Sequence, residues 1–510
     1  MITGELKNKV DSIWDTIWTG GITSPITVLE QITYLMFMKL LDDNQLRAEA
    51  NANILGVTLT NKVFHDGICV ISETPRIETE YLNLRWSVFH NFEPIAMLEN
   101  IRNYVFPFIK SIGKGMDTAF SRYMKDTVFL IPTGNVLAKV VDGIDALDMN
   151  NKDLMGDVYE YLLSKIAASG ENGQFRTPRH IIDMMVQLMK PTLKDKILDP
   201  AMGSAGFLQQ SCAYIITHQR TELMKSQNAA YFKSGLFSGY DTDQSMLRIG
   251  AMNMMLHGVE DPNIQYRDSL SKENSERDGY SLIMANPPFN LSNWGQAQLR
   301  DDVRWKYGIP PAGNANYAWI QHMIHHLAPN GKIGLVLANG SLSTQSSGEG
   351  EIRKNIIEAD LVEGIVALPP NLFYSVTIPV TLWFISKNKK QKGKTLFIDA
   401  RKMGTMVTRK HRDFSEEDIR KLADAFEAFQ KGSLEEIRGF CAIADLETIK
   451  RQDYILTPGR YVGIEEQEDD GEPFEEKMAR LTSELSGLFE KSHKLETEIK
   501  ERLGAIGYEI

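Results

Sequence analysis

Cysteine is scarce in this chain of 510 residues, which contains only Cys69, Cys212 and Cys441. The three lie far apart in sequence, without a C-x-x-C pair or the Cys/His spacing of a zinc site. No run of eighteen apolar residues occurs, and residues 1–7 lack the charged-then-apolar layout of a secretion signal. These absences argue against a disulfide scaffold, a metal centre and a membrane span, and they predict reduced core thiols in a cytoplasmic protein.

Positive charge is also in short supply, with 56 Lys and Arg against 67 Asp and Glu and a net charge of −11. A protein that holds nucleic acid alone usually carries a basic surface. We therefore expect either locally concentrated positive charge or a partner that supplies most phosphate contacts, and we favour the partner. The densest basic cluster, Lys387, Lys389, Lys390, Lys392 and Lys394, is more typical of a solvated loop than of a phosphate site.

The chain is long enough for two or three domains, and the spacing of its apolar residues changes along its length. Residues 1–150 show apolar residues at helix spacing, as in 28–41, and predict a helical domain. In residues 151–398, short apolar strands alternate with helices, which predicts an α/β domain with a mostly parallel sheet covered on both faces. The strand candidates are 196–198, 236–240, 282–284, 333–337, 361–368 and 381–385. Ligands bind such sheets at the carboxyl ends of the strands.

Residues 399–464 are predicted to form a C-terminal extension, followed over 465–510 by an acidic linker and an amphipathic helix. Apolar residues in that helix step alternately by four and three, with Ser492 as a polar break. The stripe consists of Phe474, Met478, Leu481, Leu485, Leu488, Ser492, Leu495 and Ile499. Such a heptad pattern predicts a partner helix, and the alternative is a helix folded back on its own domain.

The tetrapeptide Asn286-Pro287-Pro288-Phe289 follows the apolar run 281–285, which predicts a buried strand. The two prolines fix φ and remove two backbone donors, so this loop cannot join the sheet. The Asn286 amide offers an acceptor and a donor, which suits an exocyclic amine. Phe289 offers a flat face on which an extruded base can rest. The motif predicts chemistry on the amino group of a planar ring, and the alternative is a proline-stiffened turn.

A second loop, residues 199–208, lies between a predicted strand and a predicted helix. Gly203 and Gly206 permit a tight turn with close approach of a ligand, and the helix N-terminus that follows favours a carboxylate or another anion. The next strand ends at Asp241, an acid suited to ribose hydroxyls, whereas Asp243 either faces outward or caps the following helix.

Asp268 follows another short apolar stretch and could accept a hydrogen bond from an adenine amine, or be an ordinary turn residue. A cofactor with adenosine and a carboxylate, bound without a phosphate cradle, fits S-adenosylmethionine better than ATP. Neither G-x-G-x-x-G nor a complete Walker loop is present, since Asn388 stands where the segment 388–395 would need glycine.

Taken together, these motifs resemble the adenine-N6 DNA methyltransferases, specifically the modification (M) subunit of type I restriction–modification systems. The resemblance is carried by residues 153–163, 173–179, 199–208, 286–289 and 368–373 and spans roughly residues 28–461. It implies a helical N-terminal domain, a Rossmann-like class I methyltransferase domain, and a C-terminal helix that packs on a separate specificity subunit.

The resemblance also implies roles for individual residues. Phe175, Thr177 and Pro178 would cover the methionine end of the cofactor, and Phe373 or Tyr374 would be a second aromatic against the flipped base. The remaining cofactor residues would be Asp199, Gly203, Ser204, Gly206, Asp241 and Asp268, and the catalytic loop would be Asn286, Pro287, Pro288 and Phe289. Two departures stand out: Asp241 follows Asp199 by 42 residues, which makes 217–233 an insertion or a longer helix, and Ala205 replaces a possible glycine.

The implied reaction is transfer of a methyl group from S-adenosylmethionine to N6 of a flipped-out adenine in double-stranded DNA. Asn286 and the carbonyl of Pro287 would accept the two amine hydrogens. The implied partners are DNA, a specificity (S) subunit bound through the C-terminal helix, a second M subunit and a restriction (R) subunit, with neither metal nor membrane. Two alternatives stay open: methylation of a protein glutamine or an RNA base amine, and a catalytically silent scaffold.

Overall fold

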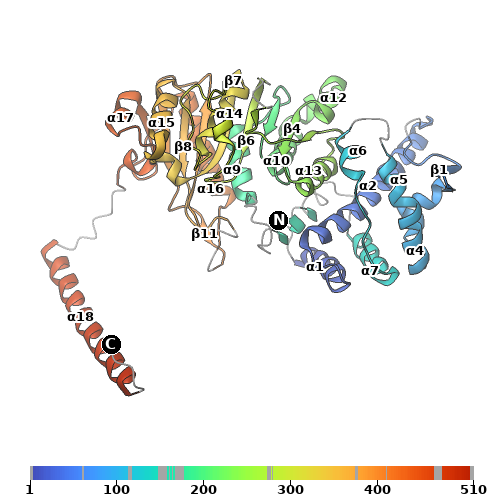
Figure 1. Ribbon diagram of the computed structural model, residues 1–510, viewed down its shortest axis with the longest axis horizontal. Helices are drawn as coiled ribbons and strands as arrows, with labels where there is room; N and C mark the ends of the chain where they lie inside the picture. The colour runs from blue at the N-terminus through green and yellow to red at the C-terminus, as the bar shows by residue number, and fades with distance from the viewer. Residues whose placement is uncertain are drawn as a thin grey trace. The chain divides into compact units, whose positions relative to one another are not determined.

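The computed structural model describes residues 4–59, 62–112, 118–147, 158–159, 161–163, 165–166, 177–272, 277, 279–373, 377–408, 411–464 and 474–505. Contacts divide the chain into two compact units, Met1–Gly463 and Ile464–Ile510, which are described separately (Figure 1). Within the ranges just given, no helix is long and apolar enough to span a bilayer.

The N-terminal region is helical, as the apolar spacing predicts. Its longest helix, α2 (Pro25–Leu55), begins where Ser24 accepts a hydrogen bond from the Thr27 amide and ends at Gly56, whose φ is 65°. The other elements are α1 (Gly4–Thr19), β1 (Ile68–Glu73), β2 (Arg76–Glu80), α3 (Trp86–Phe89), α4 (Pro94–Asn100), α5 (Phe106–Ser111), α6 (Ala119–Met124) and α7 (Gly134–Asp145). The β1–β2 hairpin is an addition that the sequence did not predict.

A nine-stranded sheet forms the centre of the first unit, in the order β13-β10-β8-β9-β7-β6-β3-β4-β5. Most neighbours are parallel, but β9 runs antiparallel to β7 and β8, and β13 antiparallel to β10. The strands are β3 (Ile197–Asp199), β4 (Phe237–Asp241), β5 (Asn263–Tyr266), β6 (Tyr280–Ala285), β7 (Leu327–Ala338), β8 (Val362–Ala367), β9 (Val380–Ser386), β10 (Lys394–Asp399) and β13 (Cys441–Asp445). The strand order reverses between β3 and β6, because β4 and β5 lie on one side of β3 and β6 and β7 on the other. Ligands bind at such a reversal in folds of this kind.

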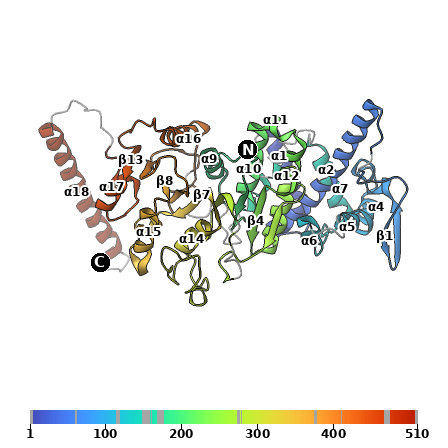
Figure 2. The same cartoon turned by 90° about the horizontal axis from the view of Figure 1, so that it is seen from above.

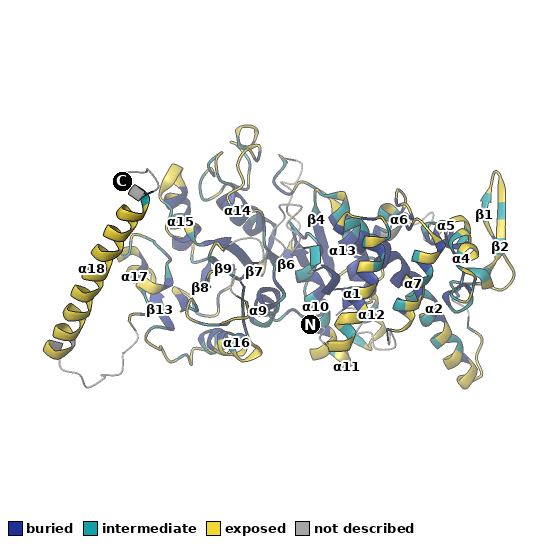
Figure 3. Ribbon diagram, turned by 90° about the horizontal axis from the view of Figure 1, so that it is seen from below, coloured by how far each residue is buried: buried dark blue, intermediate teal, exposed yellow. Residues whose placement is uncertain are grey.

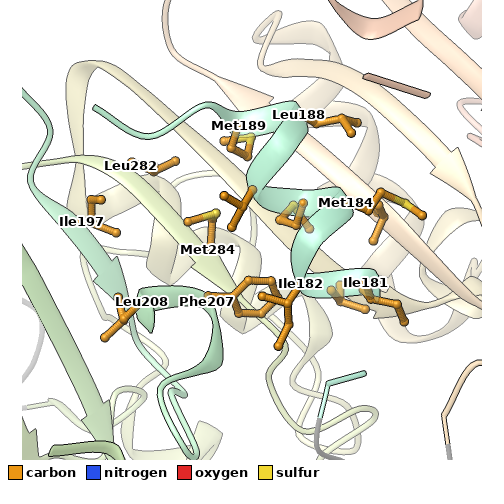
Figure 4. Close-up of a cluster of buried hydrophobic side chains, with 14 of the residues drawn as sticks. Ile181, Ile182, Met184, Leu188, Met189, Ile197, Phe207, Leu208, Leu282 and Met284 are labelled. Carbon is orange, nitrogen blue, oxygen red and sulfur yellow. The ribbon is translucent and has the colours of Figure 1, made fainter. Parts of the chain in front are cut away.

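Helices cover both faces of the sheet (Figure 2). One face packs against α9 (Arg179–Met189), α10 (Gly206–His218) and α16 (Glu416–Lys431), and the other against α14 (Asn316–His326) and α15 (Glu349–Glu358). Figure 4 shows the core on the first side, where Ile182 of α9 lies beside Phe207 of α10. These apolar contacts hold α9 and α10 against the sheet.

The helix α13 (Gln244–Leu256) joins the N-terminal helices to the sheet. Its Leu247 and Met254 belong to the sheet core, while Met252 and Leu256 belong to the N-terminal core. The Arg248 guanidinium also donates to a carboxylate oxygen of Glu30 in α2 over 3.0 Å. The helix α13 therefore packs against both the N-terminal core and the sheet core.

The predicted boundary at residue 398 falls at the end of β10, and the segment that follows returns to the same sheet. It contributes α16, the β13 strand, α17 (Leu446–Arg451) and a small hairpin of β11 (Thr405–Met406) and β12 (Arg412–Asp413). Burial of Phe426 and Phe429 against the sheet explains why this segment is part of the central core.

The long distance between Asp199 and Asp241 is explained by two extra helices, α11 (Arg220–Leu223) and α12 (Ser226–Ser234). Phe232 of α12 is buried and meets Phe237 of β4 edge-on at 5.6 Å. The hydroxyl of Tyr231 donates to the carbonyl of Asp195 over 2.7 Å. Residues 217–233 thus lengthen the crossover between β3 and β4.

The second unit contains the helix α18 (Phe474–Ala505), which covers the predicted heptad stripe. Figure 3 shows it exposed along nearly all of its described length. The apolar stripe is likewise exposed, with Met478, Leu481, Leu485, Leu488, Leu495 and Ile499 all between 43% and 57% accessible.

Candidate active site

The tetrapeptide at residues 286–289 directly follows the buried strand β6, which pairs with β3 on one side and β7 on the other. Pro287 is buried, Pro288 is exposed, and Asn286 and Phe289 are half-buried. The side-chain nitrogen Nδ2 of Asn286 donates to the Thr177 hydroxyl oxygen over 2.9 Å. This bond connects the end of β6 to the residue that precedes Pro178 and α9.

The loop that continues beyond Phe289 is held by α14. Asn290 adopts a left-handed backbone, with φ 52°, and its amide N–H donates to Oδ1 of Asn316 over 3.0 Å. In return, Nδ2 of Asn316 donates to Oδ1 of Asn290 over 2.9 Å. Asn316 is almost fully buried at the start of α14, so this reciprocal pair fixes the loop to a rigid helix.

The second loop begins at Asp199, the last residue of β3. Its carboxylate is buried, accepts a hydrogen bond from the Ala201 amide over 3.1 Å, and lies near Asp241. Burial raises the pKa of Asp199 to about 8, and the negative charge of Asp241 acts in the same direction.

Glycine is needed at two positions of this loop for different reasons. Gly203 has a φ of +50°, and a Cβ added there would meet no atom within 4 Å. At Gly206, the first residue of α10, an added Cβ would lie 2.7 Å from Cδ1 of Ile182. Ala205 takes up a left-handed backbone (φ 64°) without being glycine, which explains how the loop turns with one glycine fewer.

Asp241 ends β4 and faces this loop. Its Oδ2 accepts the Gly203 amide hydrogen over 2.9 Å, and its Oδ1 accepts that of Asp243 over 2.9 Å. Burial raises the pKa of Asp241. Asp243 caps α13 through the amide of Ser245 over 2.8 Å, so the capping alternative for this residue is confirmed.

Asp268 follows β5, and its Oδ1 accepts a hydrogen bond from the Leu270 amide over 3.1 Å. The next carbonyls, those of Ser269, Leu270 and Ser271, accept hydrogen bonds of 2.9–3.0 Å from the buried guanidinium of Arg304. This role of Arg304 could not be predicted from the sequence, because Arg304 lies more than 30 residues away in a loop without a motif.

These parts surround one cavity of about 910 Å³. Eleven of the predicted cofactor and catalytic residues line it: Thr177, Asp199, Gly203, Ser204, Gly206, Asp241, Asp268, Asn286, Pro287, Pro288 and Phe289. The sequence reasoning missed further lining residues, including Thr242, Met246, Leu270, Leu291, Trp294 and Trp319. Apolar side chains after a strand or on a helix look like ordinary core residues, so only the fold could identify them.

The remaining predicted site residues have other positions. Phe175 and Tyr374 lie outside the described residues. Pro178 is buried at the N-terminus of α9 and is not part of the described cavity lining. Phe373 is buried and meets Phe289 edge-on at 6.0 Å, and it is likewise outside that lining. In the described ranges, no group of three or more His, Cys, Asp or Glu side chains could hold a metal ion.

Comparison with protein families identifies two matching regions. The N-6 DNA Methylase family matches residues 150–470, and the HsdM N-terminal domain matches residues 6–144. The second match coincides with the helical N-terminal region, and the first contains the nine-stranded sheet.

Several relatives are similar over most of the chain. The Type I restriction enzyme HindI methylase subunit of Haemophilus influenzae is 46% identical over 388 residues, which are 75% of this chain and 83% of that protein. The Type I restriction enzyme MjaIX methylase subunit of Methanocaldococcus jannaschii is 41% identical over 370 residues, which are 70% of this chain and 64% of that protein.

Solved structures share the fold. The methyltransferase subunit of a type I restriction-modification system from Streptococcus thermophilus has a TM-score of 0.66 at 21% identity, covering 90% of this chain and 98% of that one. A chain from a study of the assembly and conformational transition of the type I R-M system has a TM-score of 0.64 at 19% identity, covering 99% of both chains. These neighbours agree with the helical region and the Rossmann-like sheet predicted from the sequence.

Proposed function

This chain belongs to the N-6 DNA methylase family, among the methylase subunits of type I restriction enzymes, and from this membership we propose that it methylates N6 of adenine in double-stranded DNA. The adenine is flipped out of the duplex, and the DNA sequence is read by a separate specificity subunit. The methyl donor is S-adenosylmethionine, whose sulfonium supplies an activated methyl group.

One observation carries the proposal: the glycine loop, both acids and the Asn286 motif line the same cavity. A volume of about 910 Å³ is at the upper end of the range for ligand sites, so it can hold a nucleoside cofactor together with part of a base. The cofactor residues lie at the reversal of strand order, and Asn286 directly follows the neighbouring strand β6.

The residues present fit this cofactor. Open space beside Gly203 would be filled by any Cβ, so the backbone there can approach a ligand closely. The Asp241 carboxylate accepts from the backbone N–H groups of Gly203, Thr242 and Asp243, and a carboxylate offers about four acceptor sites, so it can still accept from a ribose hydroxyl. Asp268 and Leu270 line the cavity on the side suited to the adenine ring.

Methylation of an adenine amine needs hydrogen-bond acceptors for the amine hydrogens, and the Asn286-Pro287 segment supplies them. The lone pair of an adenine amine is delocalised into the ring, which makes the nitrogen a poor nucleophile. Asn286 and the Pro287 carbonyl would accept its hydrogens and favour a tetrahedral nitrogen. Phe289 would stack on the flipped base, worth roughly 1–3 kcal/mol against an extrusion cost of similar size. Over the described lining there is neither Cys nor His, so a covalent route like that at cytosine C5 has no nucleophile here.

The net charge of the chain and the exposed apolar stripe of α18 both indicate that it works with partner proteins. A chain with net charge −11 is poorly suited to hold DNA alone. The apolar stripe of α18 is exposed and is suited to a partner helix, which we assign to the specificity subunit. A second copy of this chain and a restriction subunit would complete the complex.

Two alternatives use the same cavity. A protein glutamine or an RNA base amine could also present its nitrogen to Asn286, and a scaffold would bind partners without transferring a methyl group. The family membership and the α18 stripe favour the DNA substrate over the first alternative. The intact Asn286 and Phe289 favour an enzyme over the second.

The test is methyl transfer by the assembled complex. The chain is co-expressed with a cognate specificity subunit, and transfer of tritiated methyl from S-adenosylmethionine to unmethylated duplex DNA is measured, in parallel with Asn286→Ala. We expect N6-methyladenine that requires the partner and disappears in the variant. Robust transfer without a partner would contradict the separate reading of sequence, and cofactor binding without any transfer to DNA would favour the other amines.

A further inference from the structure

Thr177 contacts the catalytic amide directly, a role that the sequence did not assign to it. The Nδ2 group of Asn286 donates to Oγ1 of Thr177 over 2.9 Å, and both residues line the cavity. Sequence reasoning placed Thr177 only over the methionine end of the cofactor. We propose that Thr177 is a positioning residue that sets which way the Asn286 amide points, an inference that rests on the proposed adenine methylation.

The orientation matters because the two ends of an amide have opposite hydrogen-bonding properties. Rotation by 180° about χ2 of Asn286 exchanges an acceptor oxygen with a nitrogen that carries two donors, and both orientations have similar shapes. Only the oxygen can accept a hydrogen from an adenine amine. Because Thr177 receives the Nδ2 donor, the oxygen is turned to the other side of the same group.

Thr177 is itself held in place, as a positioning group must be. It precedes Pro178, which restricts its backbone to extended conformations. The Pro178 carbonyl accepts the amide hydrogens of Ile181 and Ile182 over 3.0 and 3.1 Å, which anchors this residue to the first turn of α9. The same turn is tied to β12 by His180, whose Nδ1 lies 2.6 Å from Oδ1 of Asp413.

The new role and the predicted cofactor role are compatible. A hydroxyl that accepts a hydrogen bond from Asn286 still has its own hydrogen to donate, for example to a cofactor carboxylate. Loss of the hydroxyl therefore affects two quantities that can be measured separately: cofactor affinity, and the rate of transfer once the cofactor is saturating.

The experiment uses the full chain in complex with its specificity subunit and compares Thr177→Val with Thr177→Ser. Valine keeps the shape of threonine without its hydroxyl, whereas serine keeps the hydroxyl. We expect Thr177→Val to lower the single-turnover rate at saturating S-adenosylmethionine by about 10-fold, and Thr177→Ser to restore most of it. Thr217→Val is a matched control, because the Thr217 hydroxyl is exposed and donates only to the Ala213 carbonyl among the bonds described.

A second measurement separates positioning from structural damage. With 2-aminopurine at the target position, fluorescence reports base flipping, which does not depend on the orientation of the Asn286 amide. We expect the Thr177→Val complex to flip the base like the wild type while transferring more slowly.

An unchanged rate at saturating cofactor, or a loss confined to cofactor affinity, would overturn the inference. So would a joint loss of flipping and thermal stability in Thr177→Val, because that pattern marks a structural role. Absence of N6-methyladenine with the wild-type complex would instead contradict the proposed function, and the two failures are thus distinguishable.

Discussion

Asp241 has a structural task in addition to the ligand role that its position suggests. It accepts the amide hydrogens of Gly203 and Asp243, and so ties the glycine loop to the end of β4. The sequence predicts Asp241 as a ribose acid from its place after a strand. The bond to Gly203 could not be predicted, because it joins residues 38 apart and depends on β3 and β4 being neighbours.

Substitution of the two loop glycines separates backbone strain from collision. Gly203→Ala places a side chain at φ +50° in open space, so we expect about 1–2 kcal/mol of strain together with weaker cofactor binding. Gly206→Ala drives a methyl group to 2.7 Å from Cδ1 of Ile182, an overpacking cost of about 1–3 kcal/mol. The free energy of unfolding from urea titration and cofactor affinity from calorimetry measure both effects.

The matched partner substitution is Ile182→Val, which removes the colliding Cδ1 atom. It should recover part of the stability lost in Gly206→Ala and none of that lost in Gly203→Ala. Equal responses of the two glycine variants to Ile182→Val would show that the collision at Gly206 is not the cause.

The buried carboxyl of Asp199 predicts a pH dependence of stability. Its pKa is raised from 3.8 to about 8 in the folded chain, so between these values the folded state binds more protons than the unfolded state. The Asp199 contribution therefore weakens stability as pH rises through this window, by up to about 1.4 kcal/mol per pH unit.

The measurement compares the wild type with Asp199→Asn in urea titrations from pH 4 to pH 8. Asparagine keeps an acceptor for the Ala201 amide but cannot ionise, so the difference in stability should shift in favour of the variant as pH rises. Parallel pH profiles of the two proteins would mean that Asp199 is not the titrating group.

At the scale of elements, strands with strong apolar runs were predictable. The six candidate strands correspond to β3, β4, β6, β7, β8 and β9, because each is buried on both faces and reads as a continuous apolar segment. The β5 strand was missed because Asn263, Gln265 and Tyr266 make it half polar at the sheet edge. The antiparallel direction of β9 was also beyond the sequence, since direction depends on the path of the chain and not on composition.

The helix α14 is predicted to hold the catalytic loop through Asn316. Asn316→Ala removes both hydrogen bonds to Asn290 and leaves a left-handed residue without its support. We expect the rate of methyl transfer to fall about 10-fold or more, because small shifts of a reacting group are costly, while cofactor affinity changes little. Single-turnover rates and equilibrium cofactor binding of the assembled complex provide the two readouts.

The control for this prediction is Asn314→Ala. The half-buried Asn314 amide donates to the same oxygen of Asn290, but over a longer distance of 3.4 Å, and its Oδ1 accepts the Asn316 amide hydrogen over 2.9 Å. The effect on the transfer rate should therefore be clearly smaller than that of Asn316→Ala. If the two variants were equally slow, the reciprocal pair would not be the element that positions the loop.

At the scale of the whole molecule, the predicted solvated loop with the basic cluster at 387–394 is only partly exposed. Lys389 is buried and pairs with Asp360 at 2.5 Å, and the ammonium of Lys387 donates to the Leu327 carbonyl over 2.6 Å. Lys390, Lys392 and Lys394 remain exposed. Two of the five charges are thus used within the fold, and this strengthens the expectation that a partner supplies positive charge for DNA.

That expectation leads to α18, whose stripe should control assembly without affecting the cavity. Leu485→Glu and Leu488→Glu place charges in the middle of the seam, where burial against a partner would leave them unpaired. We expect the double variant to lose co-purification with the specificity subunit and partner-dependent methyl transfer. Cofactor affinity and thermal unfolding of the isolated chain should remain at wild-type values, because residues 464–510 form a separate compact unit.

The matched control is Ser483→Glu, which adds a charge to the same helix on the side opposite the stripe. It should assemble and transfer like the wild type, since a charge there stays in water. Equal loss of assembly in Ser483→Glu would point to helix stability or net charge as the cause. Normal assembly of the Leu485→Glu/Leu488→Glu variant would mean that the specificity subunit binds elsewhere, and that the stripe serves another contact.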